Sequence, residues 1–202
     1  IRMAEEDIRF QLVGSAAGGV VPGPGKPTEA QEGCAVRFDP NGAFFFAGTA
    51  SGHLFAAGKE CKTGKALVGV WEPRKTVVGT AIDELVGAGA TARAAVAVSA
   101  DEAYAVFDGK DGTKLVTWTG QAWKAELSPF GTVTQMFVAS DGATWAIGDK
   151  GLFEHPKGGV WTKVELPAGA SPTSAWAKNH DVLWVVTDDK KHVVIRPLVY
   201  VG

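Results

Sequence analysis

Residues 133–166, VTQMFVASDGATWAIGDKGLFEHPKGGVWTKVEL, contain in one stretch the pattern that decides the fold. An apolar run ends at an Asp-Gly pair, a second run has a tryptophan at its centre, a third follows a turn, and a fourth begins at another tryptophan. Asp-Gly pairs tolerate the positive φ angles of tight hairpins, and β-branched and aromatic residues favour strands. The stretch therefore predicts four short antiparallel strands.

The same pattern recurs along the chain at a nearly constant step. The turn residues Asp101, Asp141 and Asp181 are spaced 40 residues apart. A second row of turn aspartates keeps almost this step, with an aromatic residue four positions before each: Tyr104 before Asp108, Trp145 before Asp149, and Trp184 before Asp188. A period of about 40 residues with several short strands per unit is typical of β-propeller blades. We therefore expect an all-β, propeller-like fold of about four blades with four antiparallel strands each.

A β-sandwich is the alternative fold. It also consists of short strands with turns about every 8–12 residues. A sandwich does not require a repeat of about 40 residues, whereas a propeller does. The constant step therefore favours the propeller.

The repeats also define the domain organisation. Residues 1–33 are interpreted as an N-terminal strand (IRFQLV, 8–13) followed by a Gly- and Pro-rich linker, and residues 34–202 as the blades. The fourth copy is short, and propellers often close by borrowing a terminal strand. Either 8–13 or the C-terminal tail is a candidate to complete it, although 8–13 is equally suited to an edge elsewhere. The chain starts at Ile1 without a signal peptide, which indicates a processed protein or a piece of a longer one.

The first interval between copies is longer than the others. Asp39 and Asp101 are 62 residues apart, and the excess falls at 76–92. Ile82 and Val86 have helical spacing within this segment. We expect an inserted loop or short helix there, serving either packing or contact with a partner.

Composition and charge exclude several classes of function. Apolar residues make up 46% of the 202 residues, and the net charge is −2. Nucleic-acid binding is not expected, because it requires a clustered basic face. No apolar stretch approaches the roughly 18 residues of a membrane-spanning helix. No metal or cofactor is expected, because the histidines lack metal-ligand spacing and no phosphate-binding loop is present.

One segment resembles known propeller repeats. Residues 139–167, ASDGATWAIGDKGLFEHPKGGVWTKVELP, are similar to blades of the propeller repeats of bacterial sensor and surface proteins, and to tectonin-type blades. The resemblance covers 133–167 well and 34–196 loosely. It implies a binding or scaffolding propeller. The sialidase Asp-box is not matched, because the segment from Ser140 to Trp145 lacks two spacer residues.

The function predicted from these observations is non-catalytic. We expect a binding or scaffolding propeller that contacts another protein or assembles into a larger complex, including self-assembly. The alternative is a glycan-binding lectin or a propeller-based glycan hydrolase or lyase. An enzyme is the less favoured interpretation, because propeller motifs specify a fold and seldom a function.

The candidate binding face is a ring of acidic turns. Turns between the second and third strands of all blades lie on the same side of an up-and-down propeller. The residues expected there are Asp108, Asp111, Asp149, Asp188 and Asp189. Such a ring concentrates negative potential and favours a basic partner or a cation. The alternative is that these residues are solvated hairpin tips.

The tryptophans fall into two rows and two outliers. Trp145 and Trp184 occupy the central strands and are predicted to lie in the core between blades. Trp71, Trp123 and Trp161 begin or end outer strands, where blade packing is favoured over a ligand-binding belt. Trp118 and Trp176 belong to neither row and are possible aromatic contacts for a ligand.

The chain contains two cysteines, Cys34 and Cys61. Two cysteines in a Gly- and turn-rich β protein predict one disulfide and an extracytoplasmic location, in the periplasm, at the cell surface or secreted. A regular blade would place the two residues roughly 15 Å apart, from five residues at about 3.3 Å each. The bond therefore requires an irregular first blade, because a disulfide joins Cα atoms within about 7 Å.

Overall fold

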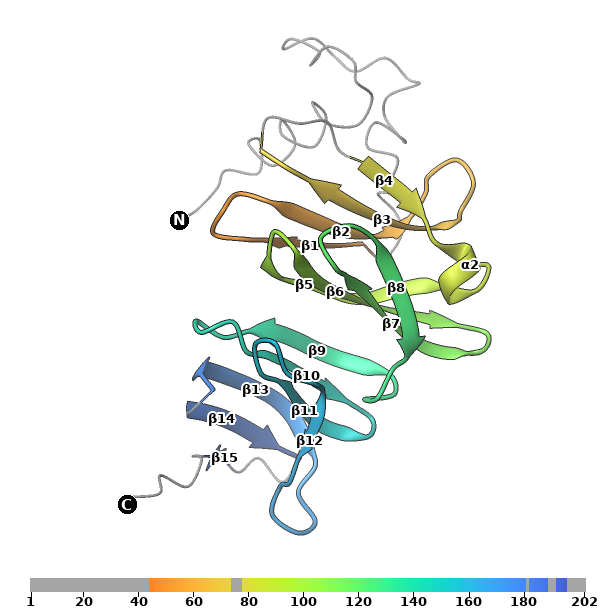
Figure 1. The fold of residues 1–202 in the computed structure, drawn as a ribbon. Coiled ribbons are helices and arrows are strands. Elements are labelled where there is room, and N and C mark those ends of the chain that lie inside the picture. The colour runs from red at the N-terminus through yellow and green to blue at the C-terminus, as the bar shows by residue number, and fades with distance from the viewer. Residues whose placement is uncertain (1–43, 74–77, 181, 189–191, 196–202) are drawn as a thin grey trace, which may run out of the picture.

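The computed structural model of the chain describes residues 44–73, 78–180, 182–188 and 192–195. The strands in these residues form four separate antiparallel sheets, each built from consecutive strands. The sheets follow one another through the molecule in chain order (Figure 1). A sandwich would have two sheets packed face to face. The propeller-like fold predicted from the repeat is confirmed, and we call the sheets blades 1 to 4.

Blade 1 differs from its predicted boundaries. Its strands, in sheet order, are β1 (Phe45–Gly48), β2 (Leu54–Lys59), β3 (Ala66–Trp71) and β4 (Val78–Ala81). β4 pairs with β3 in the register Leu67 to Ala81 and Val70 to Val78. Part of the segment 76–92, where a loop or short helix is expected, is therefore the edge strand of this sheet.

The remaining blades keep the predicted strand order. Blade 2 contains β5 (Thr91–Ser99), β6 (Glu102–Gly109), β7 (Gly112–Trp118) and β8 (Trp123–Leu127). Blade 3 contains β9 (Val133–Val138), β10 (Thr144–Gly148), β11 (Gly151–His155) and β12 (Thr162–Val164). Blade 4 has three strands among the described residues, β13 (Pro172–Asn179), β14 (Val182–Thr187) and β15 (His192–Ile195). The predicted strand 8–13, the linker up to residue 33 and the tail 198–202 lie outside the described residues.

A helical turn, α2 (Asp83–Val86), joins blades 1 and 2. Ile82 and Val86 are buried in the apolar cluster that these two blades share, which includes Val68 and Phe107. The carboxylate of Asp83 accepts a hydrogen bond from the backbone N–H of Ala66 at 2.9 Å. The inserted segment thus fills the space between two blades. No helix among the described residues is long and apolar enough to cross a membrane.

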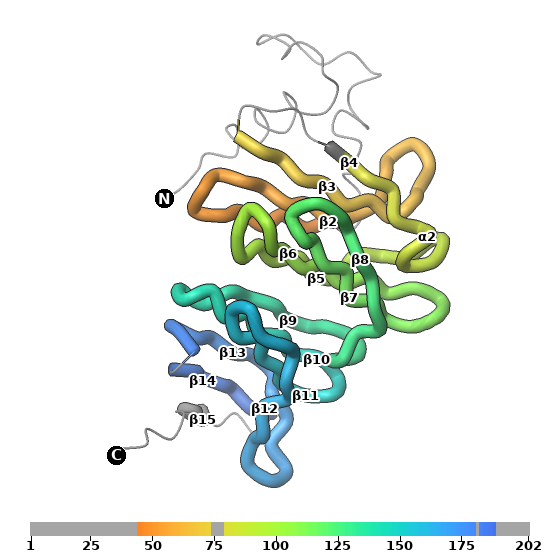
Figure 2. The backbone as a smooth tube through the Cα atoms, viewed as in Figure 1, coloured from red at the N-terminus to blue at the C-terminus, as the bar shows by residue number. Residues whose placement is uncertain are grey.

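Blades pack through alternating side chains, because successive residues of a strand point to opposite faces. In β10, Ala146 faces blade 2, while Trp145 and Ile147 face blade 4. Trp145 is 2% exposed, so the prediction that it lies between blades is confirmed. The tube in Figure 2 shows the four blades stacked in this way, with blade 4 at one end.

A side-chain amide reinforces the contact between blades 3 and 4. The Gln135 amide nitrogen donates to the carbonyl of Ala175 at 2.9 Å, and the backbone N–H of Ala175 donates to the Gln135 carbonyl oxygen at 3.0 Å. The backbone N–H and carbonyl of Ala175 therefore both have a hydrogen-bond partner at this contact. This pair fixes the relative position of the first strands of the two blades.

Candidate functional site

The predicted acidic turns lie on one side of the molecule. Asp108 is the second-last residue of β6, and Asp149 and Asp188 directly follow β10 and β14. The ends of these three second strands point to the same side in Figure 1. We call this side the acidic-row face. Asp111 is exposed at the tip of the β6–β7 turn on the same side. Asp189 lies outside the described residues.

The acidic row makes structural contacts within each blade. The Asp108 carboxylate accepts hydrogen bonds from Arg93 Nε at 2.5 Å and from Thr113 Oγ1 at 2.7 Å. In blade 4, the backbone N–H of Asp188 donates to the carbonyl of Ser171 at 2.9 Å, and its carboxylate accepts from the Ser171 N–H at 3.3 Å. The Arg93 and Ser171 contacts tie the end of the second strand to the start of the first strand, and the Thr113 contact ties it to the third strand.

Blade 3 repeats the backbone part of this arrangement. The backbone N–H of Asp149 donates to the carbonyl of Thr132 at 3.1 Å. A Cβ atom added to Gly131 would lie 1.7 Å from Asp149 Oδ1, so the carboxylate rests directly on this glycine. The recurrence of the aspartates therefore has a structural explanation in every described blade that contains one. Binding by the acidic row stays a prediction.

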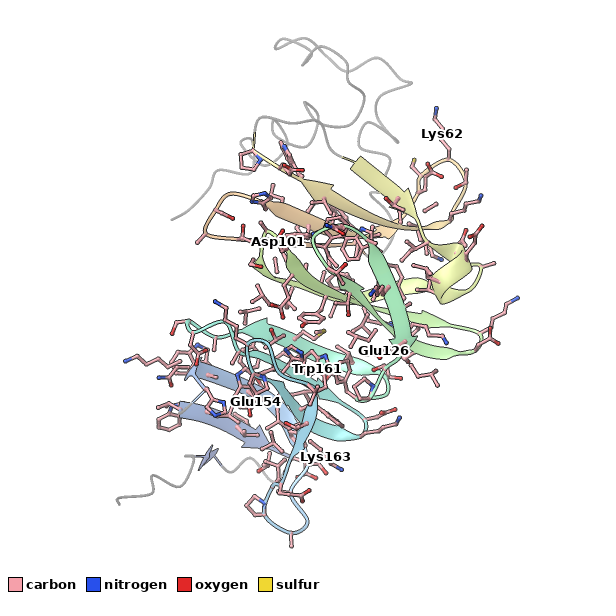
Figure 3. The ribbon with its side chains drawn as sticks, viewed as in Figure 1. Lys62, Asp101, Glu126, Glu154, Trp161 and Lys163 are labelled. Carbon is pink, nitrogen blue, oxygen red and sulfur yellow. The ribbon has the colours of Figure 1, made fainter. Side chains whose placement is uncertain are left out.

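Sequence reasoning did not find the cavity beside Asp149. It has a volume of about 650 Å³, is open to solvent, and is lined by the β10–β11 turn, by β12 and by the connection to β13. Figure 3 labels Lys163 on β12 at this place. The charged residues that line it are Asp149, Lys150, Lys163 and Glu165. Because two acids and two lysines meet here, the charge around the cavity is balanced rather than negative.

The cavity wall also contains apolar and hydroxyl groups. Val164 and Leu166 contribute apolar side chains, and Thr134 and Ser171 contribute hydroxyls. Cavities of roughly 300–1,000 Å³ with an apolar lining and a few polar groups are typical binding sites. The alternating pattern of β11 and β12 does not predict this cavity. Its third wall is the irregular segment 165–172, whose path the pattern does not determine.

The opposite side of the molecule contains a polar contact between blades 3 and 4. The Asp141 carboxylate accepts hydrogen bonds from the backbone N–H groups of His180 at 2.6 Å and of Ala143 at 3.1 Å. Slight desolvation raises the pKa of Asp141, but these backbone hydrogen bonds outweigh it and hold the pKa below its usual value. The His180 ring also pairs with Glu154 of β11. Asp141 therefore fastens the turn of one blade to the next.

A buried polar cluster lies between blades 2 and 3. The Tyr104 hydroxyl donates to Glu102 at 2.6 Å and lies 3.4 Å from the His155 ring nitrogens. Trp161 packs against the Tyr104 ring with centroids 5.5 Å apart. Burial, followed by the hydrogen bond to Glu102, raises the pKa of Tyr104 above its usual value. The hydroxyl therefore stays neutral and acts as a hydrogen-bond donor.

The described residues contain no group of side chains arranged to hold a metal ion.

The two outlying tryptophans have different environments. Trp118 donates its indole N–H to the carbonyl of Ala100 at 3.0 Å and packs against Trp123 with ring centroids 5.2 Å apart. Trp176 is 57% exposed and lies directly across from Trp184 on the neighbouring strand. Trp184 is itself 46% exposed, so its predicted place in the core between blades was wrong. The reason is that, among the described residues, no sheet packs on this side of blade 4.

Cys61 lies in the turn between β2 and β3 and is not a free thiol. Cys34 lies outside the described residues, so its pairing with Cys61 stays a prediction.

No protein-family model matches the chain, and neither does any curated protein. Solved structures that resemble it include "YCF48 bound to D1 peptide" and "YCF48 from Cyanidioschyzon merolae". Each is 14% identical in sequence to this chain, and the match covers 78% of this chain with a TM-score of 0.49. The matches cover 51% and 52% of those chains, so this chain spans about half the length of the structures it matches. A likeness at this level carries no argument about function.

Proposed function

We propose that this chain is a non-catalytic propeller that binds a segment of a partner protein in the cavity beside Asp149. The observation that supports the proposal is a cavity of about 650 Å³ on the acidic-row face. Its walls are turns held by paired strands of blade 3 and by the connection to blade 4. Loops fixed on a rigid scaffold commonly provide binding sites.

The chemistry of the cavity suits a short peptide with charges of both signs. Lys150 and Lys163 offer partners for acidic side chains, while Asp149 and Glu165 offer partners for basic ones. Val164 and Leu166 offer apolar contact. In addition, β12 is the edge of its sheet among the described residues, and an extended peptide can add to such an edge through main-chain hydrogen bonds.

The proposal is tested by selecting peptides on the full chain. A random peptide library displayed on phage is panned against the immobilised protein, and the enriched sequences are synthesised and titrated by calorimetry. We expect the Lys163→Glu variant to bind the selected peptides at least about tenfold more weakly, because loss and reversal of a charge contact costs roughly 1.4 kcal/mol or more. A matched control is Lys124→Glu, at an exposed lysine on β8 of blade 2.

Two results would contradict the proposal. One is that no peptide sequence is enriched over a blank surface. The other is that Lys163→Glu and Lys124→Glu change the affinity equally, which would place the binding surface elsewhere.

A further inference from the structure

Blade 4 has one covered face and one open face. Along β14, Leu183 and Val185 are buried against blade 3, whereas Trp184 between them is 46% exposed. Along β13, Ala175 and Ala177 are buried, whereas Trp176 is 57% exposed. By the same alternation, Lys178 lies on the exposed side of β13. The exposed residues Ser174, Trp176, Lys178 and Trp184, together with the half-buried Val186, define what we call the open face.

The open face has the pattern of an inter-blade contact. In blade 3, Phe137 and Trp145 are cross-strand partners, and their rings stack at 14° with centroids 6.4 Å apart. In blade 4, Trp176 and Trp184 are partners at the equivalent positions. The blade 3 pair is packed against Ala175 and the other apolar residues of blade 4. The blade 4 pair is therefore built for the same kind of contact, with a further β-sheet opposite it.

We propose that the open face is a self-association surface, on which the open face of a second copy of this chain docks. It continues an interface that the chain already uses between its own blades. The outer side of blade 1 is the other end of the stack, and its residues Ala56 and Leu67 are buried. Of the two ends of the stack of described blades, the open face is thus the one available for contact with a second copy of the chain.

Charge favours a two-fold arrangement with the strands antiparallel across the interface. Lys178 lies near the β13–β14 turn, and Asp188 lies at the opposite end of β14. Both side chains are exposed. A two-fold axis perpendicular to the strands places Lys178 of one copy beside Asp188 of the other, as the self-complementarity of a two-fold interface requires. An axis parallel to the strands would instead bring two lysines together.

Because the contact is a single sheet face, we expect it to bury less than the roughly 800 Å² per partner of a standard interface. We therefore expect a weak dimer, with a dissociation constant on the order of 10 µM. Tryptophans are enriched among the residues that dominate binding energy at interfaces. The two tryptophans of each copy should provide most of the association, and Lys178 should set its orientation.

Sedimentation velocity of the full chain between about 1 and 200 µM tests the proposal. We expect the average sedimentation coefficient to rise from monomer to dimer across this range, and iodide quenching of tryptophan fluorescence to fall as it does. Trp176→Ser with Trp184→Ser should weaken the dimer at least about tenfold. Lys178→Glu, which leaves both tryptophans in place, should weaken it less and reduce its dependence on salt.

A control variant changes two exposed apolar residues elsewhere, Leu127→Ser and Val160→Ser, at 66% and 71% exposure. It should dimerise as the wild type does. A wild-type chain that stays monomeric at 200 µM overturns the proposal. So does a dimer that the double tryptophan variant leaves unchanged while its circular dichroism remains native. A monomer whose tryptophan fluorescence responds to chitin oligosaccharides would make the open face a glycan-binding surface instead.

Discussion

At the scale of single residues, the turn aspartates organise the blades. Each one in blades 2 to 4 lies beside the residue at, or directly before, the start of the first strand of its blade. These neighbours are alike: Thr91, Thr132 and Ser171. Asp108 and Thr91 are direct register partners, and the other two pairs share a backbone hydrogen bond. A turn and a strand start that are distant in sequence are thereby joined. This explains the recurrence of the aspartate at a nearly constant step by a role within the fold.

Gly131 tests this role of Asp149. Its φ is +67°, and a Cβ there would lie 1.7 Å from the Asp149 carboxylate. We expect Gly131→Ala to lower the free energy of unfolding by about 2 kcal/mol, with roughly 1 kcal/mol from left-handed strain and the rest from rotation of the Asp149 carboxylate away from the new Cβ. Chemical denaturation measures the change.

The control for this prediction is Gly169→Ala. Gly169 has a similar φ of +80°, but a Cβ there would meet no atom within 4 Å. It should lose only the strain, about 1 kcal/mol. Equal losses in the two variants would show that contact with Asp149 contributes nothing.

At the scale of strands and sheets, the sequence predicted most of the strands that are joined by hairpins. The turn chemistry and the alternation located the strands of blades 2 to 4, because both depend on neighbouring residues. β4 was missed, because VGTA at 78–81 is a short segment whose strand form depends on pairing with β3. The cavity was missed because it depends on the path of 165–172. The exposure of Trp184 was missed because the periodicity of a strand shows on which face of the sheet a residue lies, but not whether another sheet packs on that face.

Trp145 and Trp184 allow a direct comparison at this scale, because they occupy equivalent positions in successive blades. Trp145→Ala should lower the free energy of unfolding by about 3–5 kcal/mol, since it leaves a cavity between two blades. Trp184→Ala should change it by less than about 1 kcal/mol, since its ring is exposed. Denaturation at about 1 µM protein, where the proposed dimer dissociates, measures both. Similar losses would mean that Trp184 is covered in solution.

At the scale of the whole molecule, the stack has an interior and an end. Blade 2 is covered on both faces, with Val106 and Leu115 facing blade 3, and with Phe107 and Val116 facing blade 1. Blade 4 has one covered face among the described residues. Blades contact mainly their neighbours, as in other repeat proteins, so stability is close to a sum of blade and interface contributions. A blade with fewer interfaces should open more readily.

Native-state hydrogen exchange tests this difference in stability. Amides of β6 and β7 are expected to exchange most slowly, through global unfolding, whereas amides of β13 and β14 exchange faster, through opening of blade 4 alone. Measurement by mass spectrometry at about 1 µM protein, where the chain is monomeric, reports the faster exchange of blade 4 without any effect of association. Raising the concentration to about 200 µM should then slow exchange in β13 and β14 and leave β6 unchanged, because only the open face gains a partner. Equal protection of blades 2 and 4 in the dilute sample would contradict the stack of unequal blades, because it would require both faces of blade 4 to be covered in a single chain.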